Sequence, residues 1–136
     1  MKYVRVVTDK TGPGGAWGIL EGDTIFFVTG CPITGAANRN GTTALVAEIR
    51  RYLPPVDPPN VIALGLNYRD HAAETGKAPP AAPVIFLKAT TAVTGHLQPV
   101  MLPTEAPSCV DFEAELTVVI GKTARHVARD EALSYV

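Results

Sequence analysis

Two glutamates stand two positions apart in the segment DFEAEL at residues 111–116, and this spacing suits metal binding. If the segment is a strand, Glu113 and Glu115 point to the same face, because side chains alternate along a strand. Carboxylate oxygens are the ligands that hard cations such as Mg²⁺ prefer. A solvent-facing strand edge would explain the same pair. However, the apolar continuation at residues 117–120 predicts a buried strand, where carboxylates need a charged partner.

His71 and Glu74 form a second candidate pair. Three positions apart on a helix, the two side chains share a face. A carboxylate beside an imidazole fixes its tautomer and makes it a better general base for activating water. An ordinary solvated helix face explains the pair as well. Lys88 ends the apolar run at residues 84–87, where it either binds a substrate carboxylate or extends into solvent.

Short strands and helices must hold these side chains in place. Apolar and β-branched runs predict the strands, and the turn at residues 21–23 predicts a hairpin. In the first part of the chain we expect strands at residues 2–8, 16–20 and 24–28, then a helix from Thr42 or Thr43 to Leu53. In the second part we expect strands at 60–66, 84–87, 100–102 and 111–120, a helix from Asn67 to about Gly76, and the start of a helix at 130–136.

Four prolines within residues 54–59 predict a stiff, extended connection between two domains. We therefore place a small N-terminal domain at residues 1–55. The second domain then occupies residues 56–136. It contains every candidate residue named above.

The composition excludes several classes of protein. The chain has 136 residues, of which 46% are hydrophobic and 18% charged, so it can bury a core. Its 12 basic and 13 acidic residues leave no basic field for nucleic acid. No apolar run approaches the roughly 18 residues of a membrane span, and the N-terminus lacks a signal-peptide block. Two cysteines make no disulfide framework. We therefore expect a cytoplasmic protein without nucleic-acid or membrane partners.

Three blocks occur in a specific order: VIALGLNYRDH at residues 61–71, PVIFLK at 83–88, and DFEAEL at 111–116 followed by IGK at 120–122. Together they resemble the fumarylacetoacetate hydrolase family. Residues 1–55 look like the small N-terminal domain of many bacterial members. The resemblance implies an α+β fold, with a small β-rich N-terminal domain followed by the first part of a mixed β-roll. It also implies a homodimer.

The resemblance assigns roles to the candidate residues. Glu113 and Glu115 match two ligands of a Mg²⁺, Mn²⁺ or Ca²⁺ ion, and the family has a third acidic ligand some tens of residues later. His71 and Glu74 match the pair that activates water, on a segment that is often a mobile lid. Lys88 matches a lysine near the site. Thr91 keeps a hydroxyl, for substrate binding, where many members have serine.

Members of the family cleave carbon–carbon bonds of acylpyruvates or fumarylacetoacetate, decarboxylate oxaloacetate, or isomerise hydroxymuconate-type diacids in aromatic compound catabolism. We expect a hydrolase of acylpyruvate-like 2-oxo acids that works through a metal-stabilised enolate, with an isomerase or decarboxylase as the alternative. The third ligand and the rest of the roll would lie beyond Val136. An inactive fragment is therefore a further alternative, as is a second chain that supplies the missing C-terminal half.

Overall fold

A computed structural model describes all residues from Met1 to Val136. The chain divides into two units. The first unit comprises Met1–Leu53 together with Leu97–Val136, and the second comprises Pro54–His96.

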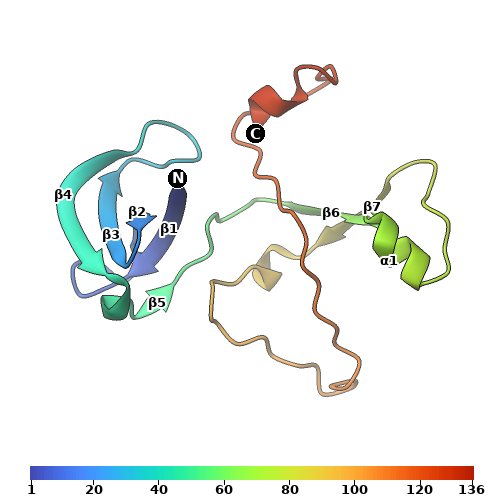
Figure 1. Cartoon of the computed structure of the whole chain (residues 1–136), viewed down its shortest axis with the longest axis horizontal. Coiled ribbons are helices and arrows are strands. Elements are labelled where there is room, and N and C mark those ends of the chain that lie inside the picture. The colour runs from blue at the N-terminus through green and yellow to red at the C-terminus, as the bar shows by residue number, and fades with distance from the viewer. The chain divides into compact units, whose positions relative to one another are not determined.

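The first unit contains a five-stranded antiparallel sheet (Figure 1). Its strands lie in the order β4-β3-β2-β1-β5. Their bounds are β1 Lys2–Val7, β2 Ala16–Glu21, β3 Thr24–Thr29, β4 Asn38–Leu45 and β5 Arg51–Tyr52. The predicted strand at 2–8 and the predicted hairpin of 16–20 with 24–28 are confirmed. Gly22 supplies the turn between β2 and β3 with a φ of 57°, which glycine adopts without strain.

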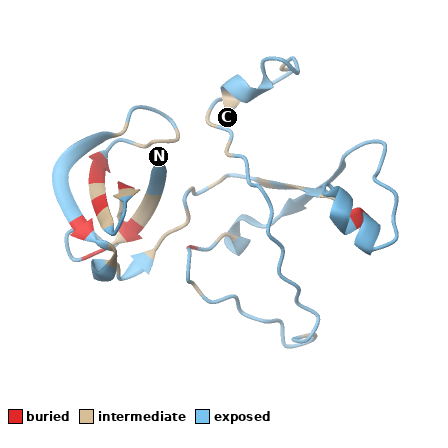
Figure 2. Cartoon of the chain, viewed as in Figure 1, coloured by how far each residue is buried: buried red, intermediate tan, exposed pale blue.

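One face of this sheet carries the core, and Figure 2 shows buried positions along its strands. Val6, Ile25, Phe27 and Ala44 are almost completely buried. They come from β1, β3 and β4, and the antiparallel register sets them on the same face because side chains alternate along each strand. Gly18 lies opposite Phe27, where the absence of a side chain leaves room for the bulky neighbours.

The helix expected between Thr43 and Leu53 is wrong. Strand β4 continues to Leu45, a 3-10 turn occupies Val46–Glu48, and β5 follows at Arg51–Tyr52. The apolar stripe that suggested a helix instead serves the sheet, since Ile49 packs against the buried core of the strands. Pairing with β3 outweighs a local helical pattern of this length.

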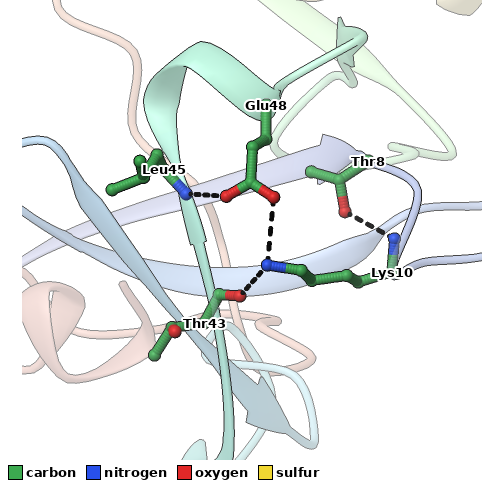
Figure 3. A network of polar contacts seen from close by, with 5 residues as sticks. All are labelled: Thr8, Lys10, Thr43, Leu45 and Glu48. Carbon is green, nitrogen blue, oxygen red and sulfur yellow. Dashed lines mark hydrogen bonds and ion pairs between the residues drawn. The ribbon is translucent and has the colours of Figure 1, made fainter.

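Lys10 and Glu48 fasten the end of β4 to the connection between β1 and β2 (Figure 3). Lys10 Nζ lies 3.0 Å from Glu48 Oε1 and donates a hydrogen bond of 2.8 Å to the Thr43 carbonyl. The backbone N–H of Leu45 donates to Glu48 Oε2 at 2.6 Å. The lysine and the glutamate thus satisfy polar groups of the backbone where the strand ends.

Residues 97–131 of the first unit form no strand or helix, and the short 3-10 helix η3 spans Ala132–Tyr135. The strands expected at 100–102 and 111–120 are therefore absent, and the latter segment is exposed apart from the half-buried Val119. A strand is stable only when a neighbouring strand satisfies its backbone, and no strand of this chain pairs with either segment. The pattern at 130–136 forms a 3-10 helix rather than an α-helix.

The second unit contains a two-stranded antiparallel sheet and one short helix (Figure 1). Strand β6 spans Val61–Gly65, helix α1 spans Arg69–Glu74, β7 spans Val84–Lys88, and the 3-10 helix η2 spans Thr90–Ala92. The strands expected at 60–66 and 84–87 are confirmed. All five residues of β7 are exposed, although an apolar run of this kind is typical of a buried strand.

Helix α1 ends as the sequence predicts and begins differently. Gly76 has a φ of 66°, its N–H donates to the Ala73 carbonyl, and Lys77 N–H donates to the Ala72 carbonyl. This arrangement is a Schellman end with glycine at its left-handed position, as predicted. The N-cap is Tyr68 rather than Asn67, and no side chain caps the helix.

No helix of the chain is both long enough and apolar enough to cross a membrane.

Candidate functional site

His71 and Glu74 both lie on α1, as the sequence predicts. The helix has six residues, so positions three apart fall on one face within a single turn. Both side chains are exposed, and no hydrogen bond or ion pair joins them. The imidazole and the carboxylate are therefore both open to solvent on one face of the helix and do not bind each other.

Lys88 is the last residue of β7 and lies opposite Val61 of β6. Its Nζ sits 5.9 Å from the centre of the Phe86 ring, within the range of a cation–π contact. No carboxylate lies within ion-pair distance of this amine. The exposed charge is accordingly available to an acidic ligand.

Thr91 lies in the 3-10 helix η2, three residues after the end of β7. It lines a hollow of about 260 Å³ together with the proline-rich segment, including Pro54, Asp57 and Pro58. The polar side chains of this hollow are the hydroxyls of Thr90 and Thr91 and the carboxyl of Asp57. The segment that the sequence marks as a linker is thus one wall of a hollow.

A larger groove of about 300 Å³ lies at the junction of β6 and α1. Leu66, Asn67 and Arg69 form one side, and Pro79 and Pro83 belong to the other. Sequence reasoning missed this groove and missed Arg69 as a functional candidate. The available signal was the proline-rich stretch at residues 79–83, which the sequence alone marks only as a loop.

Glu113 and Glu115 lie in the first unit, in the segment that forms no strand, and both are exposed. In chemical type they fit a hard divalent cation, because carboxylate oxygens are its preferred ligands. They supply only part of a coordination shell, since no group of three or more histidine, cysteine, aspartate or glutamate side chains is placed to hold a metal ion. A complete site would need at least one further donor besides these two residues.

The structure brings the candidate residues together only in part. Arg69, His71 and Glu74 share α1. Lys88 ends β7, and Thr91 lies three positions later in η2. These five residues belong to the second unit, and the two glutamates belong to the first.

Two family models match the chain. The model described as "Fumarylacetoacetate (FAA) hydrolase C-terminal" covers residues 60–136, and "Rv2993c-like, N-terminal" covers residues 1–55. The matches meet at the proline-rich segment. Together they span nearly every residue, including all the candidate site residues.

Two curated relatives and one solved structure illustrate the similarity. The 4-hydroxyphenylacetate degradation bifunctional isomerase/decarboxylase of Salmonella dublin is 49% identical over 76 residues, covering 56% of this chain and 18% of the relative. The oxaloacetate tautomerase YisK of Bacillus subtilis is 38% identical over 94 residues, covering 67% and 31%. The crystal structure of Cg1458 with inhibitor shares 34% identity and a TM-score of 0.79, covering 99% of this chain and 51% of that one.

The chain spans between 18% and 37% of the length of the first curated relatives it matches. The family model nevertheless covers more than half of this chain and contains all three sequence blocks. The β-rich architecture with one short helix agrees with the solved structure. The chain belongs to the fumarylacetoacetate hydrolase family.

Proposed function

We propose that this chain is part of an enzyme that moves a proton between carbon and oxygen in small 2-oxo acids with a second carboxylate. Isomerisation, tautomerisation and decarboxylation of such acids all pass through an enol or enolate. The observation that carries the proposal is the match of residues 60–136 to the family, with relatives named as isomerase/decarboxylase and oxaloacetate tautomerase. The activities named for these relatives favour isomerisation or decarboxylation over hydrolysis.

His71 is the proposed proton carrier. Its imidazole removes a proton from the carbon beside the 2-oxo group, and the imidazolium then gives that proton to the carbonyl oxygen as the enol forms. Glu74, on the same face of α1, orients the imidazole and stabilises it once it is protonated. The exposure of both side chains allows a substrate to reach them directly.

Lys88 is the proposed partner of the substrate's 2-oxo acid end. A lysine amine is a point charge that pairs with a carboxylate from many directions. Thr91, which follows in η2, offers a hydroxyl that both donates and accepts hydrogen bonds. Together they would hold the substrate while the proton moves.

Glu113 and Glu115 are the proposed ligands of a divalent cation, Mg²⁺ first among the candidates. A bound cation would polarise the 2-oxo carbonyl and so make the adjacent carbon more acidic. The two glutamates would contribute two oxygen donors to it. The remaining donors would come from substrate, water or further protein groups.

Single substitutions in the full-length protein test these roles. We expect His71→Ala to lower kcat for the enol–keto conversion of oxaloacetate by about 10²- to 10⁴-fold, the usual contribution of a general acid–base residue. Glu113→Gln is expected to raise the Mg²⁺ concentration needed for half-maximal rate. Glu105→Gln, an exposed glutamate outside the candidate residues, is the control. Unchanged kcat in His71→Ala would exclude His71 as the proton carrier.

Hydrolytic cleavage of acylpyruvates is a second candidate, favoured by the His71 and Glu74 pair on α1. The same pair suits activation of a water molecule that attacks the second carbonyl. Cleavage would release pyruvate and a carboxylic acid, whereas isomerisation and tautomerisation release nothing. Incubation of the wild-type protein with acetylpyruvate, followed by NMR, distinguishes the two candidates.

A further inference from the structure

We propose that the groove at the junction of β6 and α1 is a binding subsite for a carboxylate on a short carbon chain, with Arg69 as its anion-binding residue. This inference rests on the proposed function, because it names the residue that binds the second carboxylate of the substrate. It adds to that function a role for Arg69 and for the groove, neither of which has a role in the mechanism proposed above.

The groove has a suitable size and lining. Its volume is about 300 Å³, near the lower end for small-molecule sites. Apart from Arg69 and Asn67, its lining residues are leucine, glycine, proline or alanine. A hydrocarbon chain can pack against such a surface because it has no polar groups that would need hydrogen-bond partners there.

Its walls are conformationally restricted. Three prolines on one side have fixed φ angles and no N–H that would need a partner. On the other side Leu66 has a φ of 53°, in the left-handed region that a leucine rarely adopts. Residues held in such conformations cluster at ligand sites, where the surrounding structure maintains them. The groove is therefore formed before a ligand arrives.

Arg69 supplies the only charge among the residues that line the groove. Its guanidinium is exposed, and no carboxylate of the protein lies within ion-pair distance of it. A guanidinium presents a planar fork of donors that matches a carboxylate in bidentate geometry. An apolar groove with a single unpaired arginine is thus complementary to an anion with an apolar body.

Arg69 and His71 are two residues apart on the same short helix, so they do not face each other. Arg69 is accordingly a specificity-determining residue rather than a catalytic one. It would hold the second carboxylate of the substrate, while Lys88 remains the partner proposed for the 2-oxo acid end.

Kinetics in the full-length protein test the assignment. With oxaloacetate, we expect Arg69→Ala to raise KM about tenfold or more, as for a lost hydrogen bond to a charged group, with kcat changed less than twofold. Exchange of the methyl protons of pyruvate, which lacks the second carboxylate, should be equally fast in Arg69→Ala and wild type. Arg69→Lys should recover part of the affinity. Lys77→Ala removes an exposed cation of the same unit outside the groove, and is the matched control.

Direct binding separates failure of the subsite from failure of the proposed function. Titration with glutarate, followed by NMR, needs no turnover. We expect wild-type protein and Lys77→Ala to bind it and Arg69→Ala to bind it at least about tenfold more weakly. Equal glutarate affinity in Arg69→Ala and wild type, or no binding to the wild type, would overturn the subsite. Glutarate binding that depends on Arg69 without turnover of any 2-oxo acid would support the subsite and contradict the proposed function.

Discussion

Glu48 links the charge of one side chain to the stability of the sheet. The pKa of its carboxyl is lowered from the ordinary value of 4.5, first by the hydrogen bond from Leu45 N–H and then by Lys10. A lowered pKa in the folded state means that the ionised form stabilises the fold above pH 4.5. This contribution is lost as the pH falls through the lowered value.

We therefore predict that Glu48→Gln unfolds at lower urea concentration than wild type at pH 7. The difference should shrink as the pH falls below 4.5. Urea titrations followed by circular dichroism at pH 7 and pH 3 measure both. Glu105→Gln, an exposed glutamate outside this network, should match wild type at pH 7. A deficit of equal size at both pH values would show that ionisation of Glu48 is not what stabilises this corner.

Cys31 is predicted to react at lower pH than free cysteine. The pKa of the Cys31 thiol is lowered, chiefly by the hydrogen bond from the backbone N–H of Ile33. Because the thiolate is the reactive form, alkylation of Cys31 by iodoacetamide should begin at lower pH. Mass spectrometry of peptides from protein alkylated between pH 6 and pH 9 follows each cysteine separately. A pH profile for Cys31 identical to that of N-acetylcysteine would contradict the prediction.

Some of the candidate positions could be predicted from local residue patterns, and others could not. The sequence placed His71 and Glu74 on one helix, and the structure ends that helix at Gly76 as expected, although Tyr68 rather than Asn67 is its N-cap. It did not single out Arg69, because the significance of that arginine comes from a proline-rich wall ten or more residues further along. Local spacing cannot reveal a groove whose two sides are distant in sequence.

At the scale of elements, β2 depends on a position without a side chain. A Cβ atom at Gly18 would lie 2.4 Å from Ile25 Cγ2 and 3.3 Å from the Phe26 carbonyl oxygen. Gly18→Ala is therefore predicted to destabilise the protein by about 1–3 kcal/mol, the usual cost of overpacking a core. Gly12→Ala, where a Cβ atom meets nothing within 4 Å, is the control. Urea denaturation measures both variants, and equal midpoints would refute the crowding at Gly18.

Elements that their own turns define could be predicted, and elements that depend on distant partners could not. The β2–β3 hairpin follows from a turn with glycine and two apolar runs beside it. The 43–53 segment has apolar residues at helical spacing, but pairing of β4 with β3 and of β5 with β1 decides its structure. The 111–120 segment has the composition of a strand, yet no strand of the chain pairs with it. Composition shows what a segment favours, and its neighbours determine what it forms.

At the scale of the whole molecule, large apolar side chains remain on the surface. Phe112 is 98% exposed, Leu116 83%, Leu87 71% and Ile62 65%. Exposed apolar surface of this extent is typical of interfaces, and the family resemblance implies a homodimer. We predict that light scattering on the full-length protein at micromolar concentration gives twice the mass of one chain. A monomer mass across that range would contradict the prediction.

This member of the family is proposed to catalyse proton transfer in a 2-oxo dicarboxylic acid. The most direct measurement is the rate of enol–keto conversion of oxaloacetate by the full-length wild-type protein in the presence of Mg²⁺, followed by ultraviolet absorbance. We expect a rate that is proportional to protein concentration, far above that of Mg²⁺ alone, and lost in His71→Ala. A wild-type rate equal to that of Mg²⁺ alone would contradict the proposal.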